Sequence, residues 1–277
     1  MASSLLITLR EGLEAALILG IILAYLARTG HRDKAGAVWL GTVSSIVLSV
    51  AAGVAIFLTA GGLEGHAEEI FEGATMVAAA GVLTYMIFWM RRQAIGIRAH
   101  LQAQVQTALE SGSLWALGLL AFVAVGREGL ETVLFMIAAI TTASASAALL
   151  GGGLGLAAAA VLGYLLYRGT YRLNLRAFFN VTSILLLLFA AGLLAHGLHE
   201  FHEAGLVPAL VEPVWNTNAV LDERSLLGSF LAALFGYNGD PSLVEVVAYG
   251  GYLGLVGWAY FRPPTLRELR PTTERVG

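Results

Sequence analysis

The stretch LREGLEAALILG, residues 9–20, places an arginine and two glutamates inside an otherwise apolar segment, and GREGLETVLFM, residues 126–136, does the same. Both copies contain the five-residue motif Arg-Glu-Gly-Leu-Glu. Ionisable side chains inside apolar membrane segments are rare, because their burial is costly, and they usually face a protein interior or an ion pathway. The two copies therefore indicate both the class of fold and the place of a functional site.

The composition around the motifs is that of a multi-pass membrane protein. Of the 277 residues, 57% are hydrophobic and 13% are charged, and the mean hydropathy is +0.76, far outside the range of soluble domains. A net charge of -3 without a basic stripe argues against a nucleic-acid partner. The absence of cysteine excludes disulfides, thiolate metal sites and cysteine nucleophiles.

Seven stretches have the roughly 20 apolar residues that a helix needs to cross the hydrocarbon core. We therefore predict an all-α fold of seven transmembrane helices, and we interpret the first as a retained helix because it is charged and lacks a signal-peptide cleavage pattern. The predicted spans are residues 4–27, 36–60, 69–90, 113–140, 146–167, 177–202 and 243–261. Trp39, Trp89 and Trp258 lie near span ends and are predicted to be interfacial anchors.

The basic loops predict the orientation. All of them fall on one side of the predicted membrane, so the positive-inside rule places the N-terminus outside and the tail 263–277 in the cytoplasm. These basic residues are Arg28, Arg32, Lys34, Arg91, Arg92, Arg98, Arg168, Arg172, Arg176, Arg262, Arg267 and Arg270. The outer segment 205–242, with Arg224 as its one basic residue, includes SLLGSFLAALFGY, residues 225–237, which is too short to span and is predicted to be re-entrant or interfacial.

The two motif copies lie in the first and fourth spans, which run in opposite directions. Residues 1–92 and 113–204 therefore form a predicted 3+3 inverted repeat, followed by the outer segment 205–242 and the seventh helix 243–261, all within one transmembrane domain, 1–262. Secondary transporters often place a binding site where two inverted halves meet near the bilayer midplane. Helical rise gives matching depths: Glu11 lies about 25 Å from Arg28, and Glu128 lies about 22 Å from Ser113.

Spacing within the motif predicts a metal site. The two glutamates of each copy are three residues apart and share a helix face, and the arginine lies four residues before the second glutamate, close enough to pair with it. The predicted metal ligands are Glu11, Glu14, Glu128 and Glu131, with Arg10 and Arg127 in supporting ion pairs. Carboxylate oxygens suit hard cations, and a shared ion requires the two copies to approach within about 4–6 Å. Gly12 and Gly129 are predicted to allow the first and fourth helices to cross closely.

The alternative is that the motif forms interhelical ion pairs that only pack the bundle. Two identical copies at matching depth argue against it. Further candidate ligands lie at the outer ends of the third and sixth spans, where helical spacing places them on shared faces; a plain solvated helix end is the alternative there. They are Glu68, Glu69 and Glu72, and His196, His199, Glu200 and Glu203, which together predict a vestibule that attracts metal ions. His66 and His202 are interpreted as surface residues.

The motifs, together with EEIFEG at 68–73, HGLHEFHEAG at 196–205 and FGYNGDPS at 235–242, resemble the oxidase-dependent iron transporter family of high-affinity ferric iron permeases. This resemblance implies uptake of Fe(III) across the plasma membrane, or the inner membrane in a bacterium, with the motif glutamates as iron ligands. It implies no cofactor other than the transported iron. It also implies an extracytoplasmic protein that delivers or oxidises iron, because this chain has no long extracytoplasmic domain.

Two alternatives stay open. Oxygen ligands also accept Mn or Fe(II), so the cargo is one of several hard cations. A membrane-embedded metalloenzyme with carboxylate and histidine ligands would use the same residue types. Against the enzyme, His196 and His199 lie at the outer edge rather than among the motif glutamates, and duplication in an inverted repeat suits transport better than catalysis.

Overall fold

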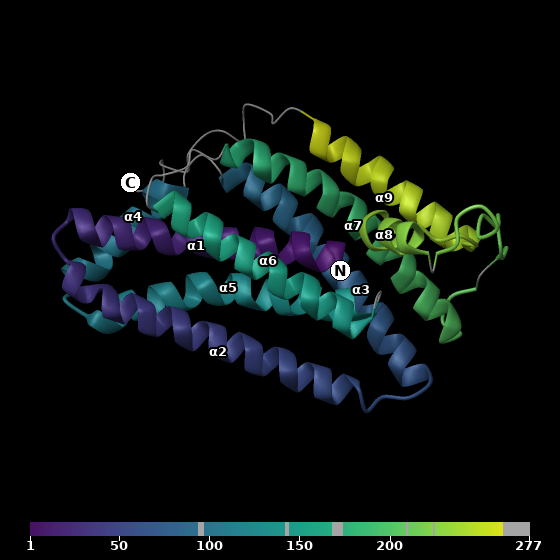
Figure 1. Ribbon diagram of the computed structural model, residues 1–277, viewed down its shortest axis with the longest axis horizontal. Coiled ribbons are helices and arrows are strands. Elements are labelled where there is room, and N and C mark those ends of the chain that lie inside the picture. The colour runs from purple at the N-terminus through teal and green to yellow at the C-terminus, as the bar shows by residue number, and fades with distance from the viewer. Residues whose placement is uncertain (94–96, 142–143, 168–173, 209, 224, 263–277) are drawn as a thin grey trace, which may run out of the picture.

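The computed structural model describes residues 1–93, 97–141, 144–167, 174–208, 210–223 and 225–262, which fold into an all-α bundle (Figure 1). A long helix covers each of the seven predicted spans. These helices are α1 Ala2–Arg28, α2 Ala35–Ala60, α3 His66–Gln93, α5 Leu114–Thr141, α6 Ala145–Tyr167, α7 Leu175–Glu203 and α9 Leu243–Phe261. The predicted all-α class is therefore confirmed.

Five of these helices are long and apolar enough to cross a membrane on length and composition alone. They are α2, α3, α6, α7 and α9. The helices α1 and α5 are 27 and 28 residues long, and each carries the three charged side chains of a motif copy. The charges that mark the predicted site are thus what separates these two helices from the other five.

Three pairs of long helices pack side by side: α1 with α6, α2 with α5, and α3 with α7 (Figure 1). The motif helices α1 and α5 also contact each other, and α9 lies against α7. One apolar core, which includes Met86, Phe135 and Leu186, joins α3, α5 and α7, and a second, which includes Ile22 and Leu117, joins α1 and α5. This packing brings α1 and α5 together inside the bundle.

The α1–α6 contact depends on a glycine. A Cβ atom added at Gly155 would meet the Thr8 hydroxyl and the backbone of Leu5 and Leu9, whereas one added at Gly153 meets nothing within 4 Å. We expect Gly155→Ala to destabilise the protein by about 1–3 kcal/mol through overpacking. Gly153→Ala, on the same helix, should leave the melting temperature in detergent unchanged. Equal melting temperatures for the two variants would contradict this description of the contact.

The helix α4, Ile97–Glu110, was not predicted. It buries Leu101, Val105 and Ala108 against the second apolar core, and Tyr25 of α1 donates a hydrogen bond to Gln106 at 2.8 Å. The spacing of the three buried residues is typical of an amphipathic surface helix. The sequence carries this signal, but a helix of 14 residues is too short to span the membrane and so is not among the predicted spans.

The segment between α7 and α9 contains the predicted short helix, α8 Leu226–Phe235. Ser225 caps its start, and Gly236 ends it in the left-handed conformation with φ of 65°. Gly236 also packs directly against Gly192 of α7, where a side chain on either residue would clash. The relation of α8 to the membrane surface stays a prediction.

Part of the basis for the orientation lies outside the described residues. This part comprises the side chains of Arg92, Arg98 and Arg176, the residues Arg168, Arg172, Arg224, Arg267 and Arg270, and the tail 263–277.

Candidate metal site

The helices α1 and α5 bring the two motif copies together in the interior. The motif cluster consists of Arg10, Glu11, Glu14, Arg127, Glu128 and Glu131. On α1, Arg10 is 0% exposed, Glu11 is 1% exposed and Glu14 is 6% exposed, and on α5 Glu128 is 4% exposed. The motif glutamates therefore face the protein rather than lipid, as predicted.

Three carboxylates of the motif cluster converge. Glu11, Glu128 and Glu131 each place an oxygen within 4.8 Å of the others. This confirms the predicted separation of about 4–6 Å between the two copies. Metal–oxygen distances of roughly 2–2.6 Å allow one ion to bridge oxygens so placed.

Each arginine pairs with the second glutamate of its own copy. Arg10 Nε lies 3.1 Å from Glu14 Oε1, and Arg127 Nε donates to Glu131 Oε1 at 2.8 Å. The predicted pairs are thus present, but the copies differ: the Arg127 side chain is 34% exposed and its guanidinium lies 3.8 Å from the centre of the Trp89 ring. Trp89, predicted to be an interfacial anchor, packs on the motif cluster through this contact.

Many polar atoms of the motif cluster are buried without a hydrogen-bond partner among the described residues. Both oxygens of Glu11, one oxygen each of Glu128 and Glu131, and the two terminal guanidinium nitrogens of Arg10 are in this state, whereas Arg10 Nε and Glu14 Oε1 have their ion pair with each other. Burial of a carboxylate without compensation is costly, so such oxygens are usually paired or coordinate a metal. These oxygens suit a hard cation held between α1 and α5.

The predicted role of the motif glycines is wrong. A Cβ atom at Gly12 would lie 2.7 Å from Ala159 of α6, and one at Gly129 would clash with Ser49 of α2, so neither glycine lies between α1 and α5. Successive residues in a helix are about 100° apart. The glycine therefore cannot share the face of the two glutamates, and it serves the α1–α6 or α2–α5 contact instead.

The predicted vestibule is divided only in part, because His199 Nε2 lies 3.4 Å from Glu203 of the same helix. Its carboxylates form an acidic rim at the adjacent ends of α3 and α7, defined as Glu68, Glu69, Glu72, Glu200 and Glu203. Glu72 is half-buried and interacts electrostatically with Glu68 and Glu203, and Glu200 interacts with Glu72 and Glu203. His66, whose side chain is 79% exposed, lies 3.1 Å from Glu69 and is a surface residue as predicted.

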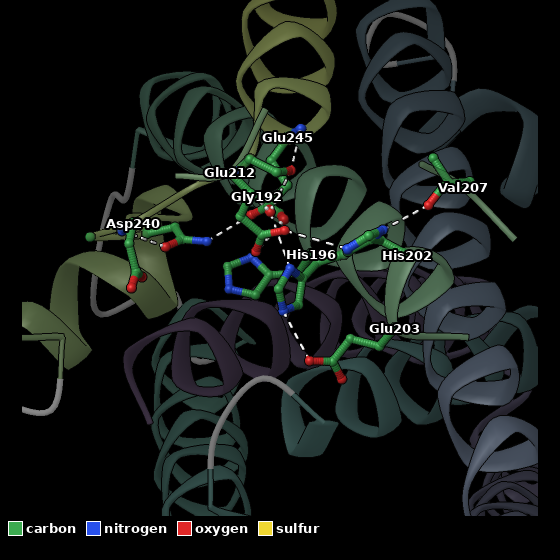
Figure 2. A network of polar contacts seen from close by, with 12 residues as sticks. Gly192, His196, His202, Glu203, Val207, Glu212, Asp240 and Glu245 are labelled. Atoms are coloured by element: carbon green, nitrogen blue, oxygen red, sulfur yellow. Dashed lines mark hydrogen bonds and ion pairs between the residues drawn. The ribbon is translucent and has the colours of Figure 1, made fainter. Parts of the chain in front are cut away.

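His196 and His199 line a separate cavity of about 370 Å³, which we call the loop cavity. Its other lining residues come from the segment between α7 and α9 and are Glu212, Pro213, Glu223, Asn238 and Asp240. Figure 2 labels His196, Glu212 and Asp240 of this cavity, together with Glu245, which lies 3.1 Å from His199 Nδ1. None of the three acids was predicted as a site residue, because nothing in the spacing of a long loop places its carboxylates beside a helix end.

His202 was predicted to be a plain surface residue, and this is wrong. Its Nδ1 lies 2.8 Å from the Val207 carbonyl oxygen, and its Nε2 lies 3.4 Å from Glu212 (Figure 2). His202 therefore attaches the start of the loop to α7.

Comparison with known proteins decides the class of protein that uses this site. The iron permease FTR1 family matches residues 1–263. The chain belongs to this family. The permease is 43% identical over 261 residues to the ferrous iron permease EfeU of Escherichia coli O6:H1 (strain CFT073), covering 94% of this chain and 95% of that protein.

Other relatives carry the same name. The permease is 42% identical to the ferrous iron permease EfeU of Yersinia pestis, over 94% of this chain and 93% of that protein. It is 43% identical to the ferrous iron permease EfeU of Shigella sonnei, over 94% of this chain and 95% of that protein. No solved structure matches the chain. The permease is thus a multi-pass transporter of iron in the cell membrane rather than an enzyme, and the metalloenzyme alternative is wrong.

Proposed function

We propose that the permease moves ferrous iron through the motif cluster, with Glu11, Glu128 and Glu131 as ligands. Glu14 is held away from the ion by its ion pair with Arg10. One observation carries this proposal: three carboxylates from two different helices lie within 4.8 Å of one another, and each keeps an oxygen that accepts no hydrogen bond from the described residues. An ion held between α1 and α5 is released when those helices separate, which is how a site between two halves serves transport.

Charge balance supports Fe(II) over the Fe(III) implied by the family resemblance. The four carboxylates and two guanidinium groups of the motif cluster give a formal charge of -2. In a buried site a divalent ion neutralises this charge, whereas a trivalent ion leaves an excess that the low dielectric penalises. The relatives named above are ferrous iron permeases, which agrees with this choice. Mn(II) has the same charge and similar ligand preferences, so it is the expected competitor.

The pairing of helices supports the inverted repeat. Exchanging α1–α3 with α5–α7 turns the α1–α6 contact into α5–α2 and leaves α3–α7 and α1–α5 unchanged, and all four contacts are present. Gly12 against α6 and Gly129 against α2 follow the same exchange. We therefore assign residues 1–92 and 113–204 to two halves of one domain. The N-terminus is assigned to the outside from the basic loops alone.

In this orientation the acidic rim lies on the outer side and the ion moves inward. An inside-negative potential favours this direction by about 2.3 kcal/mol per charge per 100 mV. The rim carboxylates attract cations toward the bundle, and a separate extracytoplasmic protein supplies the iron.

Orientation is testable by labelling, because the chain has no cysteine of its own. We expect a cysteine that replaces Ser144 or Val220 to react with an impermeant maleimide in intact cells, since both positions are exposed on the proposed outer side. A cysteine that replaces Thr107 of α4, also exposed, should react only after the membrane is opened. Labelling of the Thr107 position in intact cells would reverse the orientation.

Transport is tested with proteoliposomes that contain only the permease and an inside-negative potential. Radioactive iron kept ferrous by ascorbate should accumulate well above the level in protein-free liposomes, and excess Mn(II) should reduce it. Iron supplied as ferric citrate should accumulate more slowly. Faster uptake of ferric than of ferrous iron would overturn the assignment to Fe(II), and no uptake of either would overturn transport by this chain alone.

A further inference from the structure

The loop cavity gathers metal-ligating side chains away from the motif cluster. Two imidazoles from α7, three carboxylates and one amide from the following segment line it, and no lysine or arginine lines it among the residues that the structure describes. Such a mixture of imidazole and carboxylate groups suits a divalent cation.

Hydrogen bonds and close packing hold in place the segment between α7 and α9, which supplies the carboxylates. Thr217 N donates to the Gly239 carbonyl at 2.7 Å, Val214 N donates to the Pro241 carbonyl at 2.9 Å, and Glu223 accepts a hydrogen bond from Gly239 N. The close packing of Gly236 on Gly192 fixes the same segment against α7. The cavity is therefore a preformed feature.

One imidazole of the cavity is oriented by a buried carboxylate. Glu245 at the start of α9 is 2% exposed, and its Oε1 lies 3.1 Å from His199 Nδ1. Glu245 also accepts hydrogen bonds from the Ser242 hydroxyl at 2.8 Å and from the Asn238 amide at 2.7 Å. His199 Nε2 lies 3.4 Å from Glu203, so this imidazole is held between two carboxylates. The imidazole that leaves a nitrogen for an ion is that of His196, whose Nδ1 lies 3.1 Å from the Gly192 carbonyl oxygen. A backbone carbonyl on one ring nitrogen is a usual setting of a metal-binding histidine.

The cavity residues do not form a ready inner coordination shell. Among the described residues, the motif cluster holds the one group of three histidine or acidic ligand atoms within 4.8 Å of one another. The volume of about 370 Å³ instead accepts an ion with its water. A shell of six waters occupies about 180 Å³, at about 30 Å³ per molecule.

We propose that the loop cavity binds a hydrated divalent cation, held through its water shell by His196, Asp240 and their neighbours, as a second ion site of the permease. Its place before the motif cluster on the route of iron rests on the proposed function, whereas the binding does not. Water then leaves the ion at the motif cluster, where bare carboxylate oxygens replace it.

The test counts Mn²⁺ ions bound to the purified full-length permease in detergent by electron paramagnetic resonance. Wild type should bind two ions. Glu11→Gln/Glu128→Gln should keep the loop-cavity ion alone, and His196→Gln/Asp240→Asn should keep the motif ion alone. Glu212→Gln gives an independent cavity variant if the double variant elutes as aggregate. Glu64→Gln, at an exposed glutamate outside both sites, should bind two ions.

Hexaamminecobalt(III), whose ligands do not exchange, imitates a hydrated ion. It should displace Mn²⁺ from Glu11→Gln/Glu128→Gln, the motif variant, in which the loop cavity is intact. It should not displace Mn²⁺ from His196→Gln/Asp240→Asn, the cavity variant. If wild type binds one ion, and only Glu11→Gln/Glu128→Gln loses it, the loop-cavity site is overturned and the transport proposal stands. Two ions in the motif variant would overturn the motif cluster as an ion site and leave the loop cavity standing.

Discussion

Replacing Glu11 or Glu128 by glutamine should reduce ferrous iron uptake into proteoliposomes at least about tenfold, while the amount of folded protein stays at the wild-type level. Both carboxylates are buried, they come from different helices, and neither pairs with an arginine in the described part of the chain. Glutamine keeps the shape and removes an anionic ligand. Loss of a group that only supports a metal ligand already costs about 10–100-fold in affinity or activity.

The matched control is Glu64→Gln, which removes one exposed carboxylate outside the motif cluster. Its uptake should equal that of wild type. Normal uptake by both Glu11→Gln and Glu128→Gln would show that the motif is a packing feature, which is the alternative that the sequence left open.

Replacing Arg10 by glutamine should have the largest effect on folding. Arg10 is fully buried, and its partner Glu14 is 6% exposed, so the variant leaves an uncompensated buried carboxylate. Breaking a buried ion pair in this way costs about 3–5 kcal/mol. Little folded protein should be recovered by size-exclusion chromatography in detergent.

Two comparisons separate charge from packing. Arg127→Gln should give more folded protein than Arg10→Gln, because Arg127 is 34% exposed and its partner Glu131 is 14% exposed. The double variant Arg10→Gln/Glu14→Gln removes both charges and should recover folded protein without recovering uptake. Equal losses in the single and double variants would mean that Arg10 acts through its volume rather than its charge.

The sequence predicted those features that follow from local spacing. Helical periodicity and span length predicted all seven long helices, and spacings of three and four residues predicted the Arg10–Glu14 and Arg127–Glu131 pairs. The repetition of a charged motif in apolar segments predicted that Glu11 and Glu128 face a shared interior. Each of these conclusions rests either on residues no more than one helical turn apart or on the rule that charged side chains avoid lipid.

Features that depend on the packing of distant segments were missed. The prediction that Gly12 faces α5 was wrong because the motif alone does not tell which helix covers which face of α1. Glu212 and Asp240 were missed because an irregular segment fixes their positions through its own hydrogen bonds and through the Gly236–Gly192 contact. Likewise, Trp89 reaches Arg127 only because α3 packs on α5.

The central claim is that both motif copies bind one ion, and locating iron in the permease tests it most directly. Anomalous diffraction at the iron absorption edge from crystals grown with ferrous iron should give a peak between α1 and α5. That peak should lie within about 2–2.6 Å of a carboxylate oxygen of Glu11 and of one from Glu128 or Glu131. A peak that touches the glutamates of one copy alone, or iron bound elsewhere with the motif cluster empty, would contradict the shared site.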